Sequence, residues 1–201
     1  MRVLVACEFS GVVRRAFRER GHDAWSCDLL PAEDGSEFHI QKDAILTAWR
    51  SKWDLMIAHP PCTHLAVSGA RWFKDKQVEQ HLALKFVDEL MTACIPHICI
   101  ENPISIISSR IRKPDQIIQP WMFGHPEFKA TCLWLKGLPL LKPTVRLCPP
   151  VKGEHGWKEW NKVHRSPPGP DRWKERSRTY TGIAQAMAIQ WSAAIAEGGK
   201  P

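Results

Sequence analysis

Residues 1–21 read MRVLVACEFSGVVRRAFRERG, and this stretch decides the fold. Residues 2–7 form a run that is apolar throughout after Arg2, which is typical of a strand buried in the middle of a parallel sheet. After Gly11, apolar residues recur on one side of a segment that carries arginines elsewhere, as in an amphipathic helix that ends near Gly21. A buried strand followed at once by a helix predicts the first βα unit of an α/β fold.

The alternation of strand and helix continues along the chain. Further strands are predicted at residues 24–27, 53–58, 97–100 and 131–135. The strongest helix pattern covers residues 75–94, and a last helix is expected at residues 182–197. Repeated βα units imply a mostly parallel central sheet with right-handed crossovers. Because ligands bind at the carboxyl ends of such strands, the residues just after each strand are the candidates for function.

Length and composition describe one domain. The 201 residues suit a single hydrophobic core, and 44% of them are apolar. No run approaches the ~20 apolar residues of a membrane-spanning helix. The N-terminus lacks the basic and apolar regions of a secretory signal. We therefore expect a cytoplasmic protein with no membrane partner.

Charge and cysteine content indicate which binding partner and which cellular compartment to expect. A formal net charge of +7 favours contact with a polyanion such as nucleic acid. The seven cysteines are odd in number and most lie in apolar runs, so we expect free thiols in a reducing compartment. The absence of a Cys-x-x-Cys pair in the sequence argues against a structural zinc site.

Residues 149–176 have a different composition from the rest of the chain. They hold five prolines, three tryptophans and seven basic residues, so they are interpreted as a long loop rather than as a separate core. Cations mixed with tryptophans suit phosphate contact and base stacking. The alternative is a solvated loop whose tryptophans only cover the core. The cations we expect to contact the substrate are Lys158, Lys162 and Arg165.

Four groups suited to chemistry follow predicted strands in order. The first is the turn Cys7-Glu8-Phe9-Ser10-Gly11, where small residues let helix N-terminal amides approach a ligand. Asp28 comes next and can accept both hydroxyls of a ribose. Pro60-Pro61-Cys62 holds a cysteine that helix-terminal amides or nearby cations can activate. Glu101-Asn102-Pro103 supplies a carboxyl group able to protonate or hydrogen-bond a heterocycle.

Each group also has a purely structural interpretation. The first is an ordinary βα turn, Asp28 a helix cap or surface charge, Cys62 a core thiol, and Glu101 a solvated carboxylate. A zinc site formed by His59, Cys62 and His64 is a further alternative, although no fourth ligand is evident. The order of the four groups therefore carries more weight than any one of them.

Taken in order, the four groups resemble the motifs of the cytosine-C5 DNA methyltransferase family. That family has a Phe-x-Gly turn, an acidic residue after the second strand, a Pro-Cys nucleophile and a Glu-Asn pair. The matching positions here are Phe9-Ser10-Gly11, Asp28, Pro61-Cys62 and Glu101-Asn102. Weaker blocks match around Asp43, in the segment 124–131 and at Gly182. The short chain also resembles compact methyltransferase-like proteins of phage and prophage.

The resemblance implies a Rossmann-like S-adenosylmethionine-dependent methyltransferase domain over residues 1–201. It implies that Cys62 adds to a cytosine ring that Glu101 engages, with Lys129 supplying positive charge near the base. The implied cofactor is S-adenosylmethionine, held by Phe9, Ser10, Gly11, Asp28, Asp43, Pro60 and Gly182. The implied substrate contacts are Asn102, Glu127 and Thr131. No metal is implied, and DNA in a bacterium or a phage-infected host cell is the implied partner.

The chain departs from the family pattern in several places. Thr63 follows the cysteine where glutamine is usual, and Glu127 and Thr131 replace a glutamine and an arginine. Only about 45 residues separate Leu135 from Gly182, where the family inserts a target-recognition domain. Residues 149–176 stand in place of that domain. RNA, single-stranded DNA or a free cytosine nucleotide are thus alternative substrates, and a non-catalytic nucleic-acid-binding protein is a rival function.

Overall fold

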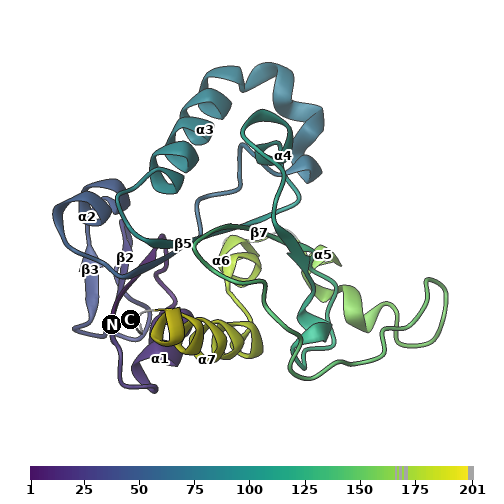
Figure 1. Cartoon of the computed structure of the whole chain (residues 1–201). Coiled ribbons are helices and arrows are strands. Elements are labelled where there is room, and N and C mark those ends of the chain that lie inside the picture. The colour runs from purple at the N-terminus through teal and green to yellow at the C-terminus, as the bar shows by residue number, and fades with distance from the viewer. Residues whose placement is uncertain (166, 168, 170–171, 199–201) are drawn as a thin grey trace.

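The computed structural model describes residues 1–165, 167, 169 and 172–198 (Figure 1). Its centre is a seven-stranded sheet in the order β3-β2-β1-β4-β5-β7-β6. The strands are β1 (Arg2–Ala6), β2 (Asp23–Asp28), β3 (His39–Gln41), β4 (Leu55–Ala58), β5 (His97–Pro103), β6 (Gln116–Ile118) and β7 (Thr131–Lys136). Strands β3, β2, β1, β4 and β5 pair in parallel, whereas β7 is antiparallel to both neighbours.

Helices cover both faces of this sheet. They are α1 (Val12–Arg18), α2 (Ala44–Arg50), α3 (Gln77–Met91), α4 (Ile107–Arg110), α5 (Lys162–Arg165), α6 (Arg172–Ser177) and α7 (Thr181–Gly198). Three short 3₁₀ segments are η1 (Val67–Asp75), η2 (Pro120–Met122) and η3 (Glu159–Asn161). Helices α1 and α7 lie together on one face, and α3 lies on the other (Figure 1). The expected Rossmann-like α/β fold with a mostly parallel sheet is confirmed.

The alternation of side chains along β1 divides the core into two layers. Val3 and Val5 pack with the residues of α1 and α7, whereas Leu4 and Ala6 pack with those of α2 and α3. A strand that is buried on both faces must be apolar at every position, which explains the continuous apolar run in the sequence. No helix within the described part of the chain is long and apolar enough to span a bilayer.

Several boundaries differ from the sequence prediction. Strand β5 runs to Pro103, so Glu101 and Asn102 lie within the strand rather than after it. The helix predicted at residues 75–94 begins two residues later and ends at Met91. Its first turns extend past the sheet, so Val78 and Leu82 are exposed although they continue the apolar pattern. Strands β3 and β6 and helix α2 were not predicted.

The segment 149–176 is not a plain loop. It contains η3, α5 and part of α6, and Asn161 is buried. The Phe128 backbone N–H donates to the Trp160 carbonyl at 2.7 Å, and their rings lie 5.6 Å apart. Tertiary contacts therefore order short helices that a Pro-rich composition does not suggest. Residues 166, 168 and 170–171 of this segment, and the terminal residues 199–201, lie outside the described residues.

Candidate active site

The loop after β4 presents Cys62 at the carboxyl edge of the sheet. The His59 backbone N–H donates to the Ala6 carbonyl at 2.9 Å, so the first residue of the loop is hydrogen-bonded to the last residue of β1. The Cys62 carbonyl accepts from the backbone N–H groups of Leu65 and Ala66, at 3.0 and 2.9 Å. Cys62 itself is exposed. A thiol on a turn that is fixed on both sides has the placement that a nucleophile needs.

Glu101 reaches the same edge because β5 is longer than β4. Strand β5 pairs with β4 only as far as Ile100, and Glu101 is the next residue. The Glu101 carboxylate lies 3.0 Å from Nδ1 of His59, which must carry the hydrogen because an ionised carboxylate only accepts. The neighbouring Asn102 donates its side-chain amide to the Pro60 carbonyl at 2.8 Å. Two side-chain hydrogen bonds thus join β5 to the cysteine loop.

The environment of Glu101 keeps it ionised. Burial raises the pKa of its carboxyl group, since a charge is disfavoured away from water. The hydrogen bond and charge of His59 outweigh burial, with Lys129 and the Thr131 hydroxyl adding to them, so the pKa lies below its ordinary value. Glu101 is therefore a carboxylate at neutral pH.

The Cys62 thiol has a raised pKa, contrary to the expectation that helix-terminal amides or nearby cations would lower it. Reduced contact with water raises the pKa of this thiol, and the negative charge of Glu101 raises it further. Lys129 and Arg176 lower it, but only in part. Cys62 is thus protonated at neutral pH until something changes its surroundings.

Lys129 lies close to both of these groups. Burial lowers the pKa of its ammonium, whereas the charges of Glu101 and Cys62 act to raise it. Its Nζ donates to the Arg178 carbonyl at 3.0 Å and lies 5.6 Å from the centre of the Tyr180 ring. The structure therefore places the three predicted catalytic residues in one electrostatic group.

The two structural alternatives for Cys62 find no support here. An exposed thiol is not a core residue. Nδ1 of His59 is engaged by Glu101, and in residues 1–165, 167, 169 and 172–198 no three His, Cys, Asp or Glu side chains are grouped to hold a metal ion. His59 and Cys62 thus belong to a loop that faces a carboxylate.

Asp28 and Asp43 come together near the ends of β1, β2 and β3. Asp28 ends β2, and Asp43 caps the N-terminus of α2 just after β3. One carboxylate oxygen of each residue accepts a hydrogen bond from a nearby backbone N–H. Leu30 donates to Asp28 at 3.0 Å, and Leu46 donates to Asp43 at 2.8 Å. Burial raises the pKa of the Cys7 thiol, and both carboxylates raise it further, so they lie near the end of β1 as well.

Glu8 shapes the turn between β1 and α1. The backbone N–H groups of Val13 and Arg14 donate to its carboxylate at 2.7 and 3.2 Å. The expectation that helix N-terminal amides are open to a ligand therefore fails for this pair, because buried Glu8 already caps them. Gly11 is needed for its left-handed φ of 68° and because a Cβ would collide with the Arg14 guanidinium.

The chain from α6 to Arg178 covers the turn between β1 and α1. The Trp173 ring of α6 lies 5.5 Å from the ring of Phe9. Arg178 donates twice to the Glu33 carboxylate, at 2.7 and 2.9 Å. Phe9 and Ser10 are both buried. The predicted cofactor residue Phe9 is thus covered by a segment that was expected to contact the substrate.

Gly182 is packed tightly against Phe123 and His125 and does not line an open surface. Its N–H donates to Nε2 of His125 at 2.9 Å, and a Cβ at this position would collide with the Phe123 carbonyl. The start of α7 is therefore packed directly against the segment that precedes β7.

The predicted substrate residues divide into two kinds. Asn102 and Thr131 are 1% and 3% exposed, and buried Glu127 accepts from the Val163 backbone N–H at 3.1 Å. These three side chains hold strands and loops in place at the edge. The exposed members of the predicted set are Lys158, Lys162 and Arg165.

Three residues at the edge were not predicted in the roles that the structure gives them. His59 was considered only as a metal ligand, yet it bonds Glu101. Arg176 was counted only among the basic residues, yet its charge acts on Cys62. Glu8 was overlooked, although an acid beside the predicted glycine turn is the signal of a helix cap.

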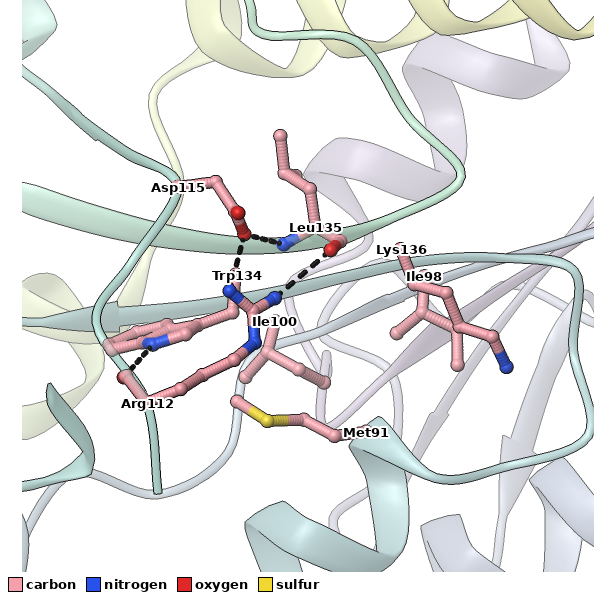
Figure 2. A pocket seen from close by; sticks show the side chains of 8 residues that line it. All are labelled: Met91, Ile98, Ile100, Arg112, Asp115, Trp134, Leu135 and Lys136. Atoms are coloured by element: carbon pink, nitrogen blue, oxygen red, sulfur yellow. Dashed lines mark hydrogen bonds and ion pairs between the residues drawn. The ribbon is translucent and has the colours of Figure 1, made fainter. Parts of the chain in front are cut away.

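A cavity of about 350 Å³ lies elsewhere, over β5 and β7 beside the end of α3 (Figure 2). Its charged groups are satisfied within the chain: Arg112 pairs with Asp115 at 2.8 Å and donates to the Leu135 carbonyl at 3.0 Å. The full lining is Met91, Ile98, Ile100, Arg112, Asp115, Trp134, Leu135 and Lys136. None of the predicted site residues lines it.

Comparison with known proteins gives a fold likeness only. Among solved structures that match is a candidate DNA modification methyltransferase encoded within a prophage of E. coli, with a TM-score of 0.48 and 15% sequence identity. The likeness covers 73% of this chain and 52% of that one, so the chain spans about half the length of that protein. No protein-family model and no curated protein matches the chain.

Proposed function

We propose that this chain is an S-adenosylmethionine-dependent methyltransferase that modifies C5 of cytosine in DNA through a covalent bond to Cys62. The observation that carries the proposal is the approach of an exposed cysteine, an ionised glutamate and a lysine at the carboxyl edge of a parallel sheet. The order of the sequence motifs that resemble the cytosine-C5 family supports it independently.

Cys62 and Glu101 have complementary tasks in this reaction. The Cys62 thiolate forms a bond to C6 of the ring, which moves electron density toward C5. Glu101 accepts from the exocyclic amine. The proton that its carboxylate takes from the Cys62 thiol passes to N3, where negative charge builds up during the addition. After C5 has gained the methyl group, a base such as water removes the C5 proton, the bond between sulfur and C6 breaks and the thiolate is released. In duplex DNA, the base first has to leave the stack.

Lys129 contributes the positive charge of the site. Its ammonium interacts with both Cys62 and Glu101 and donates a hydrogen bond to the Arg178 carbonyl. A cation in this position favours the thiolate and stabilises negative charge that develops on the base O2. Because the free thiol has a raised pKa, arrival of the substrate is the step at which ionisation has to occur.

The residues at the ends of β1, β2 and β3 fit the proposed cofactor. Asp28 and Asp43 each engage one oxygen locally, and a carboxylate has further acceptor sites for a ribose diol or an adenine amino group. S-adenosylmethionine, when bound here, supplies an electrophilic methyl group.

The proposal includes the organisation of the chain and its setting. Residues 1–201 act as a single catalytic domain, in which the segment 149–176 takes the place of a target-recognition domain. Such an enzyme acts in the cytoplasm of a bacterium or of a phage-infected cell.

Methyl transfer to four cytosine carriers in parallel tests the proposal. Tritium from labelled S-adenosylmethionine is measured on duplex DNA, single-stranded DNA, RNA and dCTP, with Cys62→Ser as the matched control. Label on DNA that depends on Cys62 supports the proposal. Label only on RNA or dCTP moves the same chemistry to that carrier, and nucleic-acid binding without transfer to any of the four supports a non-catalytic binding protein.

A further inference from the structure

His59 is held rigidly between the first strand and the edge of the sheet. Its backbone N–H donates to the Ala6 carbonyl at 2.9 Å, which anchors it to β1. Its Nδ1 lies 3.0 Å from Oε2 of Glu101, and the side chains of the two residues are 9% and 14% exposed. A hydrogen bond between two nearly buried side chains is well shielded from water and therefore directional.

A second hydrogen bond runs parallel to the first. The Asn102 amide donates to the Pro60 carbonyl at 2.8 Å, one residue further along both segments. The pair His59-Pro60 is thus bonded to the pair Glu101-Asn102 at two adjacent points. Rotation of the Glu101 carboxyl group about its side chain requires the first of these bonds to break.

The His59 ring also lies in the field of a second acid. Buried Glu8, fixed to the start of α1, interacts electrostatically with His59. Nε2 of His59 is buried and has no hydrogen-bond partner in the described part of the chain. Glu8 acts on His59, and the titratable groups that interact with Glu101 are Cys62, Cys99, Lys129 and Cys132, while Arg176 acts on Cys62 and Lys129.

We propose that His59 is a positioning residue, which fixes the carboxyl plane of Glu101 so that its remaining acceptor sites face the cytosine ring. This inference rests on the proposed function and adds a residue to it. A carboxylate has about four lone-pair sites, and His59 occupies one of them on Oε2. A hydrogen bond from a buried donor also keeps Glu101 in the ionised form that accepts from an amino group.

Two substitutions separate positioning from simple packing. His59→Leu keeps a similar volume without a donor, whereas His59→Asn places an amide N–H near the position of Nδ1. We expect His59→Leu to raise the pKa of Glu101, because the hydrogen bond that lowers it is lost. We also expect kcat to fall about 10²-fold, the size of a general acid–base contribution, with KM for nucleic acid unchanged. His59→Asn should restore most of both.

The pKa of Glu101 is measurable without substrate. Protein labelled with ¹³C at the glutamate carboxyl carbon is titrated by NMR, and Glu101→Gln assigns the signal. His64→Leu, which removes the other histidine of the loop, is the matched control and should leave this titration as it is. If His59→Leu does not fold, His59→Gln replaces it, because its amide reaches the position of Nε2 rather than that of Nδ1.

Each outcome has a distinct meaning. An unchanged Glu101 titration in a folded His59→Leu protein overturns the positioning role, as does an equal loss of kcat in the Leu and Asn variants. If the wild-type protein transfers no methyl group to any cytosine carrier, the proposed function fails. The titration still decides whether His59 controls Glu101.

Discussion

The carboxyl edge of the sheet and the C-terminal segment that covers it are built in different ways. At the edge, Cys62 and Glu101 lie on backbone that is hydrogen-bonded to β1 and β7 or to its own tight turn. The segment from residue 149 to α6 meets the edge through isolated contacts: the Trp173 ring on Phe9, the Trp160 carbonyl on the Phe128 N–H, and the Val163 N–H on Glu127. The proposed chemistry, which needs fixed geometry, thus lies on the sheet, and the cover is held by contacts that are easier to change.

The two regions also differ in charge. The edge carries the acids Glu8, Asp28, Asp43 and Glu101, whereas the segment 149–176 holds seven basic residues. Arg176 acts on the Cys62 thiol, and Arg178, just beyond the segment, pairs with Glu33. Part of the positive charge of this end of the chain therefore interacts with the acidic edge.

The largest expected effect comes from the edge. Cys62→Ser should abolish covalent trapping by DNA that contains 5-fluorocytosine, because fluorine cannot leave C5 as a proton does and the sulfur bond is then permanent. We expect a loss of at least about 10³-fold, since removal of a covalent nucleophile is among the most damaging changes to an enzyme. Denaturing gels that detect the protein–DNA adduct measure it.

Cys148→Ser is the matched control for this experiment. Cys148 is also an exposed free cysteine, but it lies just before the C-terminal segment. It should trap like the wild type. Trapping that survives in Cys62→Ser would remove Cys62 as the nucleophile and with it the proposed cytosine-C5 chemistry.

The next effect concerns the point where α7 joins the edge. Gly182→Ala places a Cβ against the Phe123 carbonyl, a backbone atom that cannot move aside cheaply. We expect the free energy of unfolding to fall by about 2–3 kcal/mol, as for overpacked core sites. Gly198→Ala in the same helix meets nothing within 4 Å and should change stability little. Urea unfolding of both variants compares them, and equal stabilities would contradict the tight packing.

The sequence predicts the strands of the sheet better than the helices and loops that cover it. Apolar runs identify β1, β2, β4, β5 and β7 because buried strands must be apolar, and the order of the motifs leads to Cys62 and Glu101. Strands β3 and β6 escape prediction because each has three residues, too few for a periodic pattern. Helix α2 was detectable in principle, since Asp43 is an ordinary N-cap.

Side-chain partners at the site could not be read from the sequence. The bond between His59 and Glu101 joins residues 42 positions apart, and only the register of β4 with β5 brings them together. The direction of the Cys62 pKa shift was also wrong, because it depends on how reduced water contact and Glu101 balance against two cations. The direction of such a pKa shift depends on the distances between the thiol and the charges around it, and a sequence motif does not give those distances.

A smaller effect is expected from the exposed cations of the C-terminal segment. Replacing Lys158, Lys162 and Arg165 together by alanine should weaken DNA binding about tenfold and reduce its salt slope by up to about 2.7, at ~0.9 for each phosphate that is no longer neutralised. Fluorescence anisotropy at several salt concentrations measures both. An unchanged slope would mean that the segment only covers the edge.

The smallest expected effect tests how both regions act on one thiol. Alkylation by iodoacetamide follows the thiolate fraction of Cys62, and the raised pKa makes this fraction small at pH 8. Lys129→Gln removes a cation at the edge, and Arg176→Gln removes one on the covering segment. Each should raise the pKa further and slow alkylation about threefold, with the larger change for Lys129. Glu101→Gln removes a negative charge, lowers the pKa and should accelerate the reaction.

Mass spectrometry of the Cys62 peptide between pH 7 and pH 10 gives the rates, with exposed Cys148 as an internal reference in the same sample. For the two cation variants, the profile should shift to higher pH, and for Glu101→Gln to lower pH. If Arg176→Gln leaves the profile unchanged while Lys129→Gln shifts it, the covering segment has no electrostatic part in the site. If both leave it unchanged, the environment of Cys62 is set by its own turn and by Glu101 alone, and activation of the thiol then has to come from the bound substrate.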